Sequence, residues 1–208
     1  MVASSESDRT FVAMLRGINV GGKHVLPMED LLSMFRDAGC SHASAYIQSG
    51  NIIFRARPSI AVGLPAAVEQ AIEDSYGFVA RSVIRTAQEL RMVATKNPLL
   101  TGDRDGGSLH VVFLADRPTP DRVAALDRKR SPPDEFAVKG SEIYLRCPNG
   151  MARTKLTNQY FDAMLSTTST VRNWRTVLKL NELAAIAEDW GRTRTDPSSR
   201  ARPGPPQR

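Results

Sequence analysis

The chain has 208 residues, of which 41% are hydrophobic and 24% are charged, with a net charge of +6. This composition is typical of a globular protein with one large or two small domains. No stretch approaches 18 consecutive apolar residues, and the first ten residues include no apolar signal region. We therefore expect no membrane partner, and we predict a cytoplasmic location.

The cysteines and histidines are too scattered to predict a metal site. Cys40 and Cys147 are more than a hundred residues apart, and His24, His42 and His110 fit no metal-ligand spacing. We expect the two cysteines to be buried free thiols. The sequence thus predicts no metal site and no cofactor.

The positive charge is concentrated at the C-terminus. Residues 191–208 hold five arginines and one aspartate, so the other 190 residues carry a net charge of only +2. The end of the chain is rich in Pro, Ser, Gly and Arg and has no apolar periodicity, which predicts a disordered basic tail over 190–208. A loose contact with RNA or acidic partners stays open, but a solvated tail is favoured.

The first part of the chain predicts a strand, a helix and a hairpin. Phe11–Leu15 is a short apolar run, and the glycine-rich loop Arg16–Pro27 follows it. We expect Pro27 to begin a helix whose apolar residues recur every three or four positions before Gly39. Two strand-like runs in Ser44–Ala56 flank Ser49-Gly50, which predicts a hairpin with a two-residue turn.

A helix, a strand and a second helix follow. Leu64 and Val68 mark the apolar face of a helix that ends near Gly77, and residues 78–84 are expected to be a strand. Thr86 and Glu89 form a capping-box pattern that opens the next helix.

The same element order then returns. The predicted elements are a strand at Leu109–Leu114, a helix after Thr119, strands at Glu135–Val138 and Glu142–Arg146, a helix through Leu156–Leu165, a strand at Ser169–Arg172 and a helix over about 173–188. Two βαββαβ units predict an α+β fold of two ferredoxin-like (alpha-beta plait) domains with antiparallel sheets, each with an extra C-terminal helix. The predicted divisions are a disordered N-terminus (1–8), a first domain (9–97), a linker (98–107), a second domain (108–189) and the tail (190–208).

Strand topology brings polar residues of the first unit to one sheet edge. In this fold the first and second strands are parallel with the third between them, so the first strand ends beside the hairpin turn. The residues gathered there are Arg16, Asn19, Gly21, Gly22, Lys23, Gln48, Ser49 and Asn51. Their donors and flexible backbone suit a small anionic or polar ligand. Alternatively, the glycines supply only positive φ angles, and Gln48 and Asn51 satisfy each other; neither a P-loop nor a dinucleotide motif is present.

The second unit gathers a different polar cluster at the ends of its third and fourth strands. Lys155, Arg172, Asn173 and Trp174 are expected to be neighbours there. Lys155 and Arg172 suit an anion but equally suit solvent. Asn173 is a candidate helix cap, and Trp174 is either a stacking platform or, as we favour, a core residue.

At these motifs the chain resembles the bacterial family known as domain of unknown function 1697. The resemblance rests on Met14–Gly22, Tyr46–Phe54, Leu109–Leu114, Pro148–Leu156 and Thr170–Leu180 and spans about residues 9–187. It implies two alpha-beta plait domains and no established activity. It also marks the cluster residues above, Lys23 excepted, as typical polar positions of the family motifs. His24, Ala152–Thr154 and Arg175 depart from the expected motifs, which leaves local loop details open.

Three functions compete at this point. We favour binding, with or without transformation, of a small polar or anionic metabolite at the loop-lined sheet edges. RNA or single-stranded nucleic-acid binding is an alternative, because RNA-recognition modules share the element order, but Phe54 and Tyr144 are the lone aromatics of the third strands. A protein-interaction module is a further alternative. No catalytic residues are assigned, so enzymatic activity and oligomeric state stay open.

Overall fold

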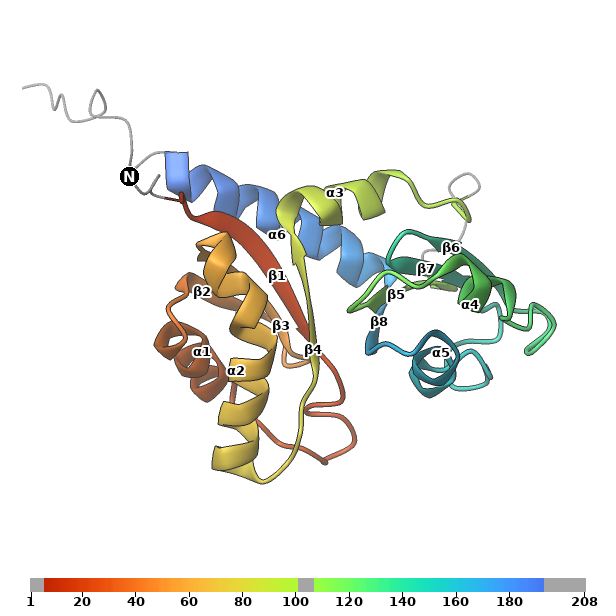
Figure 1. Ribbon diagram of the computed structural model, residues 1–208, viewed down its shortest axis with the longest axis horizontal. Helices are drawn as coiled ribbons and strands as arrows, with labels where there is room; N and C mark the ends of the chain where they lie inside the picture. Colours follow the sequence, from red (N-terminus) through yellow and green to blue (C-terminus); the bar gives the residue numbers. More distant parts are fainter. Residues whose placement is uncertain (1–5, 101–106, 193–208) are drawn as a thin grey trace, which may run out of the picture.

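The protein is an α+β structure with two four-stranded antiparallel sheets and six helices in the part that the structure describes (Figure 1). The structure is a computed structural model, and it describes residues 6–100 and 107–192. Within these residues no helix is both long and apolar enough to cross a membrane. Both sheets repeat the same strand order, as the two-unit pattern predicts.

The first sheet has the order β2-β3-β1-β4. Its strands are β1 (Arg9–Leu15), β2 (Ser41–Tyr46), β3 (Asn51–Ala56) and β4 (Ser82–Thr86), and its two crossover helices are α1 (Met28–Asp37) and α2 (Pro58–Tyr76). These helices cover one face of the sheet, where Phe11 and Phe54 pack against Leu31, Phe35 and Leu64. Phe54 therefore lies in a core rather than on a free sheet face.

The second sheet has the order β6-β7-β5-β8. Its strands are β5 (Leu109–Leu114), β6 (Glu135–Lys139), β7 (Glu142–Arg146) and β8 (Ser169–Asn173), and its helices are α4 (Pro120–Ala124) and α5 (Asn158–Leu165). Val112 and Ile143 pack with Phe161 of α5 on one face. The strand β7 pairs antiparallel with both β5 and β6, over five residue pairs each.

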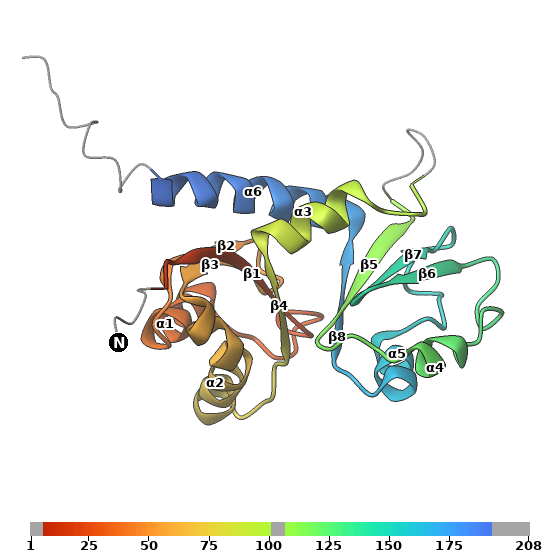
Figure 2. The same cartoon turned by 45° about the horizontal axis from the view of Figure 1, so that its top comes forward.

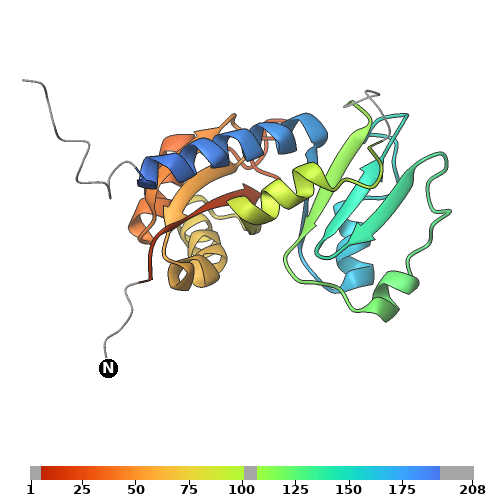
Figure 3. The same cartoon turned by 90° about the horizontal axis from the view of Figure 1, so that it is seen from above.

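The two remaining helices join the sheets. The helices α3 (Ala87–Thr95) and α6 (Trp174–Arg192) run side by side over the face of the first sheet that α1 and α2 leave open (Figure 2). Seen from above, α6 starts at the second sheet and extends across the first (Figure 3). One shared core joins Val12 and Ile53 of the first sheet to Val111 and Tyr144 of the second, with Trp174 among them. The last helix thus fixes how the two sheets face each other.

Local signals place several helix ends as the sequence predicts. Thr86 and Glu89 form the complete capping box of α3. Gly77 ends α2 in the left-handed conformation, with φ of +71°. Pro27, however, occupies the position before α1 rather than its first helical residue.

Three local predictions are wrong. The hairpin is joined by four residues, Ile47–Gly50, so Asn51 pairs with Tyr46 and not with Gln48. The fourth strand begins only at Ser82, because Phe78 leaves the sheet to stack on His24 with ring centroids 4.6 Å apart. The last helix continues to Arg192, so residues 190–192 are helical rather than part of the predicted tail.

Other predictions fall partly outside the described residues. Three predicted segments lie outside the described residues: the tail beyond Arg192, the first five residues, and most of the linker, 101–106.

The two cysteines, Cys40 and Cys147, are buried free thiols as expected. Burial raises the pKa of both thiols to about 11.

Candidate functional site

The glycine-rich loop after β1 is a small hairpin of its own. Val20 and Lys23 form an isolated antiparallel bridge, with the Lys23 N–H donating to the Val20 carbonyl at 3.1 Å. Gly21 and Gly22 at its tip both have positive φ angles, which a tight turn of this hand requires. Both glycines are exposed and nothing lies close to either. Both glycines form the turn, and a ligand-binding role for them stays a prediction.

Asn19 holds this loop against the β2–β3 turn. Its Nδ2 donates to the carbonyls of Leu26 at 2.9 Å and Gln48 at 3.0 Å, and its Oδ1 accepts from the Leu26 N–H at 2.8 Å. All of the usual side-chain donors of the amide are therefore engaged by protein. Asn19 positions the loop and has no free donor for a ligand.

Arg172 of β8 crosses from the second sheet to the first. Its Nε donates to Asn51 Oδ1 at 2.6 Å and its Nη2 donates to the Leu15 carbonyl at 2.6 Å. Its Nη1 donates to the Thr170 hydroxyl at 2.7 Å. Asn51, completely buried, also donates to the Ser49 hydroxyl at 2.8 Å. The two predicted polar clusters thus meet, and Arg172 is the residue that joins them.

The charge of Arg172 has no partner of opposite sign. Its hydrogen-bond acceptors are carbonyls, an amide oxygen and a hydroxyl, and no carboxylate within residues 6–100 and 107–192 forms an ion pair with it. Burial lowers the pKa of Arg172 from 12.5 to about 10, so it still carries its charge at neutral pH. Arg172 is half-buried, and charges that are partly removed from water in proteins are normally paired or neutralised. An unpaired guanidinium between two sheets therefore calls for a functional explanation.

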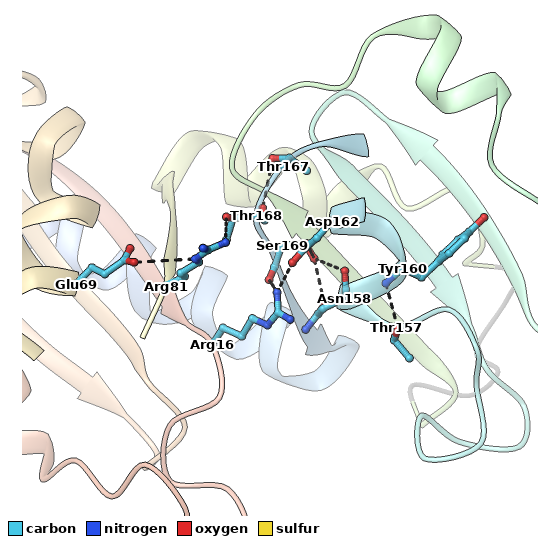
Figure 4. Close-up of polar contacts among 10 residues, drawn as sticks. All are labelled: Arg16, Glu69, Arg81, Thr157, Asn158, Tyr160, Asp162, Thr167, Thr168 and Ser169. Atoms are coloured by element: carbon cyan, nitrogen blue, oxygen red, sulfur yellow. Dashed lines mark hydrogen bonds and ion pairs between the residues drawn. The ribbon is translucent and has the colours of Figure 1, made fainter. Parts of the chain in front are cut away.

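Arg16 provides a second guanidinium at the same junction (Figure 4). It lies directly after β1, and its Nη1 forms an ion pair with Asp162 of α5 and donates to the Ser169 carbonyl at 3.3 Å. Asp162 also accepts from the Ser169 hydroxyl at 2.5 Å. The Nε and Nη2 groups of Arg16 have no hydrogen-bond partner among the described residues. Unlike Arg172, Arg16 therefore retains free donors.

A pocket of about 380 Å³ opens between these two arginines. It is lined by Arg16, Gly17, Val20, Ile47 and Ser49 of the first unit and by Asn158, Thr170, Val171, Arg172, Asn173 and Thr176 of the second. This volume falls within the range of small-molecule sites. No carboxylate, histidine or cysteine is among these lining residues. The pocket is thus cationic and rich in neutral hydrogen-bonding groups.

The lining contains several donors that the protein does not use. Asn173 Oδ1 caps α6 by accepting from the Thr176 N–H at 2.7 Å, and its Nδ2 has no partner in the part of the chain described. Asn158 accepts from Ser169 through Oδ1 and likewise keeps its Nδ2. Thr176 is only 8% exposed, and its hydroxyl has no hydrogen-bond partner among the described residues. These groups can serve a ligand without breaking an existing bond.

Not every predicted site residue lies at this pocket. Gly21, Gly22, Lys23 and Gln48 are exposed and lie outside its lining. Lys155 is exposed too; its backbone N–H donates to the Ser131 hydroxyl at 3.0 Å, and no contact joins it to Arg172. Trp174 is 4% exposed in the shared core, so it is a core residue and not a stacking platform.

The sequence reasoning missed several residues of the pocket. Val20, Ile47, Asn158, Thr170 and Thr176 were not predicted, nor was Asp162 beside it. Thr170 and Thr176 lie within the family motif around Arg172, which is a signal that could have found them. Asn158 and Asp162 lie on a helix whose approach to the first sheet depends on the packing of α6.

The sheet faces do not offer the surface of an RNA-recognition module. Such modules stack bases on exposed aromatic residues of the central strands. Phe54 is completely buried against α1 and α2, and Tyr144 is 2% exposed in the core shared with α6. Neither aromatic ring is available for stacking.

A larger pocket, of about 580 Å³, lies between α3 and the β6–β7 turn. Its buried charges are compensated: Arg85 Nε pairs with Glu142 at 2.8 Å, and Glu89 completes the α3 capping box. The pocket of about 380 Å³ is therefore the stronger candidate for a ligand site, because Arg172 in its lining has no carboxylate partner among the described residues.

Comparisons with known proteins agree with the resemblance described above. A family model described as "Protein of unknown function (DUF1697)" matches residues 9–144. The fold is similar to that of the conserved bacterial protein SP0830 from Streptococcus pneumoniae, with a TM-score of 0.63 and 20% sequence identity over 86% of this chain and 99% of that chain. At this identity the likeness concerns the fold alone. No match was found among curated proteins.

Proposed function

Because the chain belongs to the DUF1697 family, whose function is unknown, we propose a function from its own residues: it binds a small anionic or polar molecule in the pocket between the two sheets. The unpaired charge of Arg172 is the observation that carries this proposal. Keeping a half-buried guanidinium without a counterion costs free energy, in line with the lowered pKa of Arg172. A bound anion would supply the missing charge.

Different residues of this pocket supply the charge and the free hydrogen-bond donors. All five N–H groups of Arg172 are already matched by five protein acceptors, so it contributes charge rather than new hydrogen bonds. The free donors come from Arg16, Asn158, Asn173 and Thr176. Charge-assisted hydrogen bonds from such donors to an anion are the stronger kind.

We propose binding and assign no catalytic step. General acid-base chemistry would need a titratable group with its pKa near the working pH inside the pocket. The described lining supplies hydroxyls, amides and guanidiniums, which can orient a ligand and stabilise negative charge.

The finer description of the fold is also a proposal. We propose that each sheet with its two crossover helices is a ferredoxin-like unit, with 9–97 and 108–189 as the two domains. The strand order and antiparallel pairing support this. The cytosol as compartment and a bacterial source rest on the sequence pattern and the family resemblance.

A pair of variants at Asn173 tests the proposed function. Asp and Ser both cap helices as Asn does, so Asn173→Asp and Asn173→Ser both preserve the start of α6. Only Asp adds a negative charge to the pocket. With the full chain and inorganic phosphate in isothermal titration calorimetry, we expect Asn173→Ser, which loses only the Nδ2 donor, to bind about two- to fivefold more weakly than the original protein. We expect Asn173→Asp to bind at least about tenfold more weakly, since like charges ~6 Å apart at a dielectric constant of about 40 repel by roughly 1.4 kcal/mol.

A remote variant provides the control for net charge. Lys155→Gln changes the net charge by the same unit, at an exposed position outside the pocket lining. It should leave phosphate binding unchanged. Equal weakening by Lys155→Gln and Asn173→Asp would mean that overall charge, and not the pocket, attracts the anion.

A further inference from the structure

The pocket has two chemically different walls. The wall from the second unit is polar and begins at the N-terminus of α6, while the wall from the first unit includes Val20 and Ile47. These two side chains are among the most exposed large hydrophobic residues of the described chain, at 65% and 54%. A purely ionic ligand would leave these two apolar side chains without a contact.

The polar wall is positively charged beyond what its own residues neutralise. The helix α6 has 19 residues and no acidic residue in its first turn, where Asp and Glu normally favour the positive end of the helix dipole. Instead Arg172 precedes the helix and Arg175 lies within its first turn, and neither forms an ion pair among the described residues. Arg16, in contrast, is already paired with Asp162. Arg175 is exposed and lies outside the pocket lining. The charge that remains at the pocket is therefore that of Arg172, reinforced by the positive end of the α6 dipole, and together they suit a dianion.

A mostly buried residue with an unpartnered, accessible hydroxyl at the same place points independently to a ligand. Thr176 lies in the first turn of α6, lines the pocket and is only 8% exposed, yet its hydroxyl has no partner in the described residues. The Nδ2 group of Asn173 beside it is free as well. Together with the first-turn N–H groups of Trp174 and Arg175, these donors surround a position suited to the oxygens of a phosphate group.

Ile47 is held in an unfavourable conformation on the opposite wall. Its φ is +49°, in the left-handed region that β-branched residues strongly avoid. Such strain, in a residue that also exposes its side chain, is typical of positions that serve a ligand rather than stability. Asparagine or glycine would fit this turn better, so the isoleucine side chain itself requires an explanation.

We infer that the ligand is an organic phosphate monoester, whose dianionic phosphate lies at the start of α6 and whose apolar body lies against Val20 and Ile47. This inference rests on the proposed function, because it assigns a chemical class to the ligand of the same pocket. Arg16, between the two walls, donates through its free Nε and Nη2 groups.

Three probe anions separate the parts of this inference. Inorganic phosphate carries only the dianion, phenyl phosphate adds an apolar body, and benzoate has the body with a single charge. By calorimetry on the full chain, phenyl phosphate should bind about tenfold more tightly than inorganic phosphate, the gain from burying roughly 50 Å² of apolar surface. It should also bind more tightly than benzoate.

Variants of the apolar wall supply the residue-level test. Ile47→Asn relieves the backbone strain, so the thermal midpoint should stay the same or rise, while the preference for phenyl phosphate over inorganic phosphate should disappear. Val20→Ser provides a second variant in case the first alters the turn. Val62→Ser removes an apolar group that is 85% exposed on α2, outside the pocket lining, and should change neither affinity.

The outcomes distinguish the two levels of the account. Equal affinities of the original protein for phenyl phosphate and inorganic phosphate would contradict an apolar contact with Val20 and Ile47. The proposed anion site would be unaffected by this result. Benzoate binding as tightly as phenyl phosphate would overturn the choice of a dianion. If none of the three probes binds, the proposed function itself is wrong. An unchanged phenyl preference in both Ile47→Asn and Val20→Ser would place the apolar body elsewhere.

Discussion

Replacing Gly50 by alanine tests how closely the hairpin turn packs on the end of β1. Gly50 has a φ of +69°, and a β-carbon there would lie 2.8 Å from both Leu15 Cβ and Ile18 Cδ1. Gly17 has nearly the same φ, +73°, but nothing lies within 4 Å of its added carbon. Gly17→Ala is therefore a matched control, because it also places alanine at a positive φ but brings its β-carbon into no steric clash.

The expected losses in the free energy of unfolding come from the backbone conformation and from the steric clash. The left-handed conformation costs alanine about 1–2 kcal/mol in both variants. Forcing a methyl group into packed side chains adds roughly 1–3 kcal/mol in Gly50→Ala alone. For a chain of this size that difference corresponds to a thermal midpoint roughly 3–10 °C lower than in Gly17→Ala. Urea unfolding should rank the two variants in the same order, and equal losses would refute the close packing that positions Ser49, Asn51 and Arg172.

Two further predictions concern the loop and the thiols. Asn19→Asp should destabilise the protein by roughly 2–4 kcal/mol in urea unfolding, because it removes the donors to Leu26 and Gln48 and sets a carboxylate against two carbonyls. The control Gln48→Ala, at an exposed position, should change the free energy of unfolding by less than about 0.5 kcal/mol. Similar small losses in both variants would show that Asn19 does not hold the loop. Cys40 and Cys147 have pKa values raised to about 11 from 9.0, so their neutral forms stabilise the folded state, and this contribution is complete below pH 9 and is lost as the pH rises through 11. Iodoacetamide should accordingly alkylate the folded protein about tenfold faster for each pH unit between 8 and 10, and a rate that levels off near pH 9 would contradict the raised pKa values.

The sequence predicts the sheets better than the contacts between them. Apolar runs such as Leu109–Leu114 and the capping box at Thr86 are local signals, and they place β5 and α3 where the structure has them. The β2–β3 turn was predicted too short, because Ser49-Gly50 alone has the composition of a turn while Ile47, a strand-favouring residue, adopts a positive φ. Tertiary contacts with the Asn19 loop override the local preference there.

The site shows the same division between local and long-range information. Strand topology correctly gathers Arg16, Ser49 and Asn51 at one sheet edge, and Arg172 and Asn173 at another. It cannot say that the two edges meet, because that depends on α6 crossing from the second sheet to the first. The same packing buries Trp174 and leaves Lys155 outside the pocket lining, two outcomes that residue type does not determine.

The most direct test of the central claim is a nuclear magnetic resonance titration of the full chain with inorganic phosphate, following backbone and side-chain amide signals. Binding in the pocket predicts saturable shifts of the Trp174 and Arg175 backbone amides and of the Asn173 side-chain amide, with Lys155 unaffected. Signals that do not move, or small non-saturating shifts spread over exposed lysines and arginines, would contradict an anion site at the start of α6.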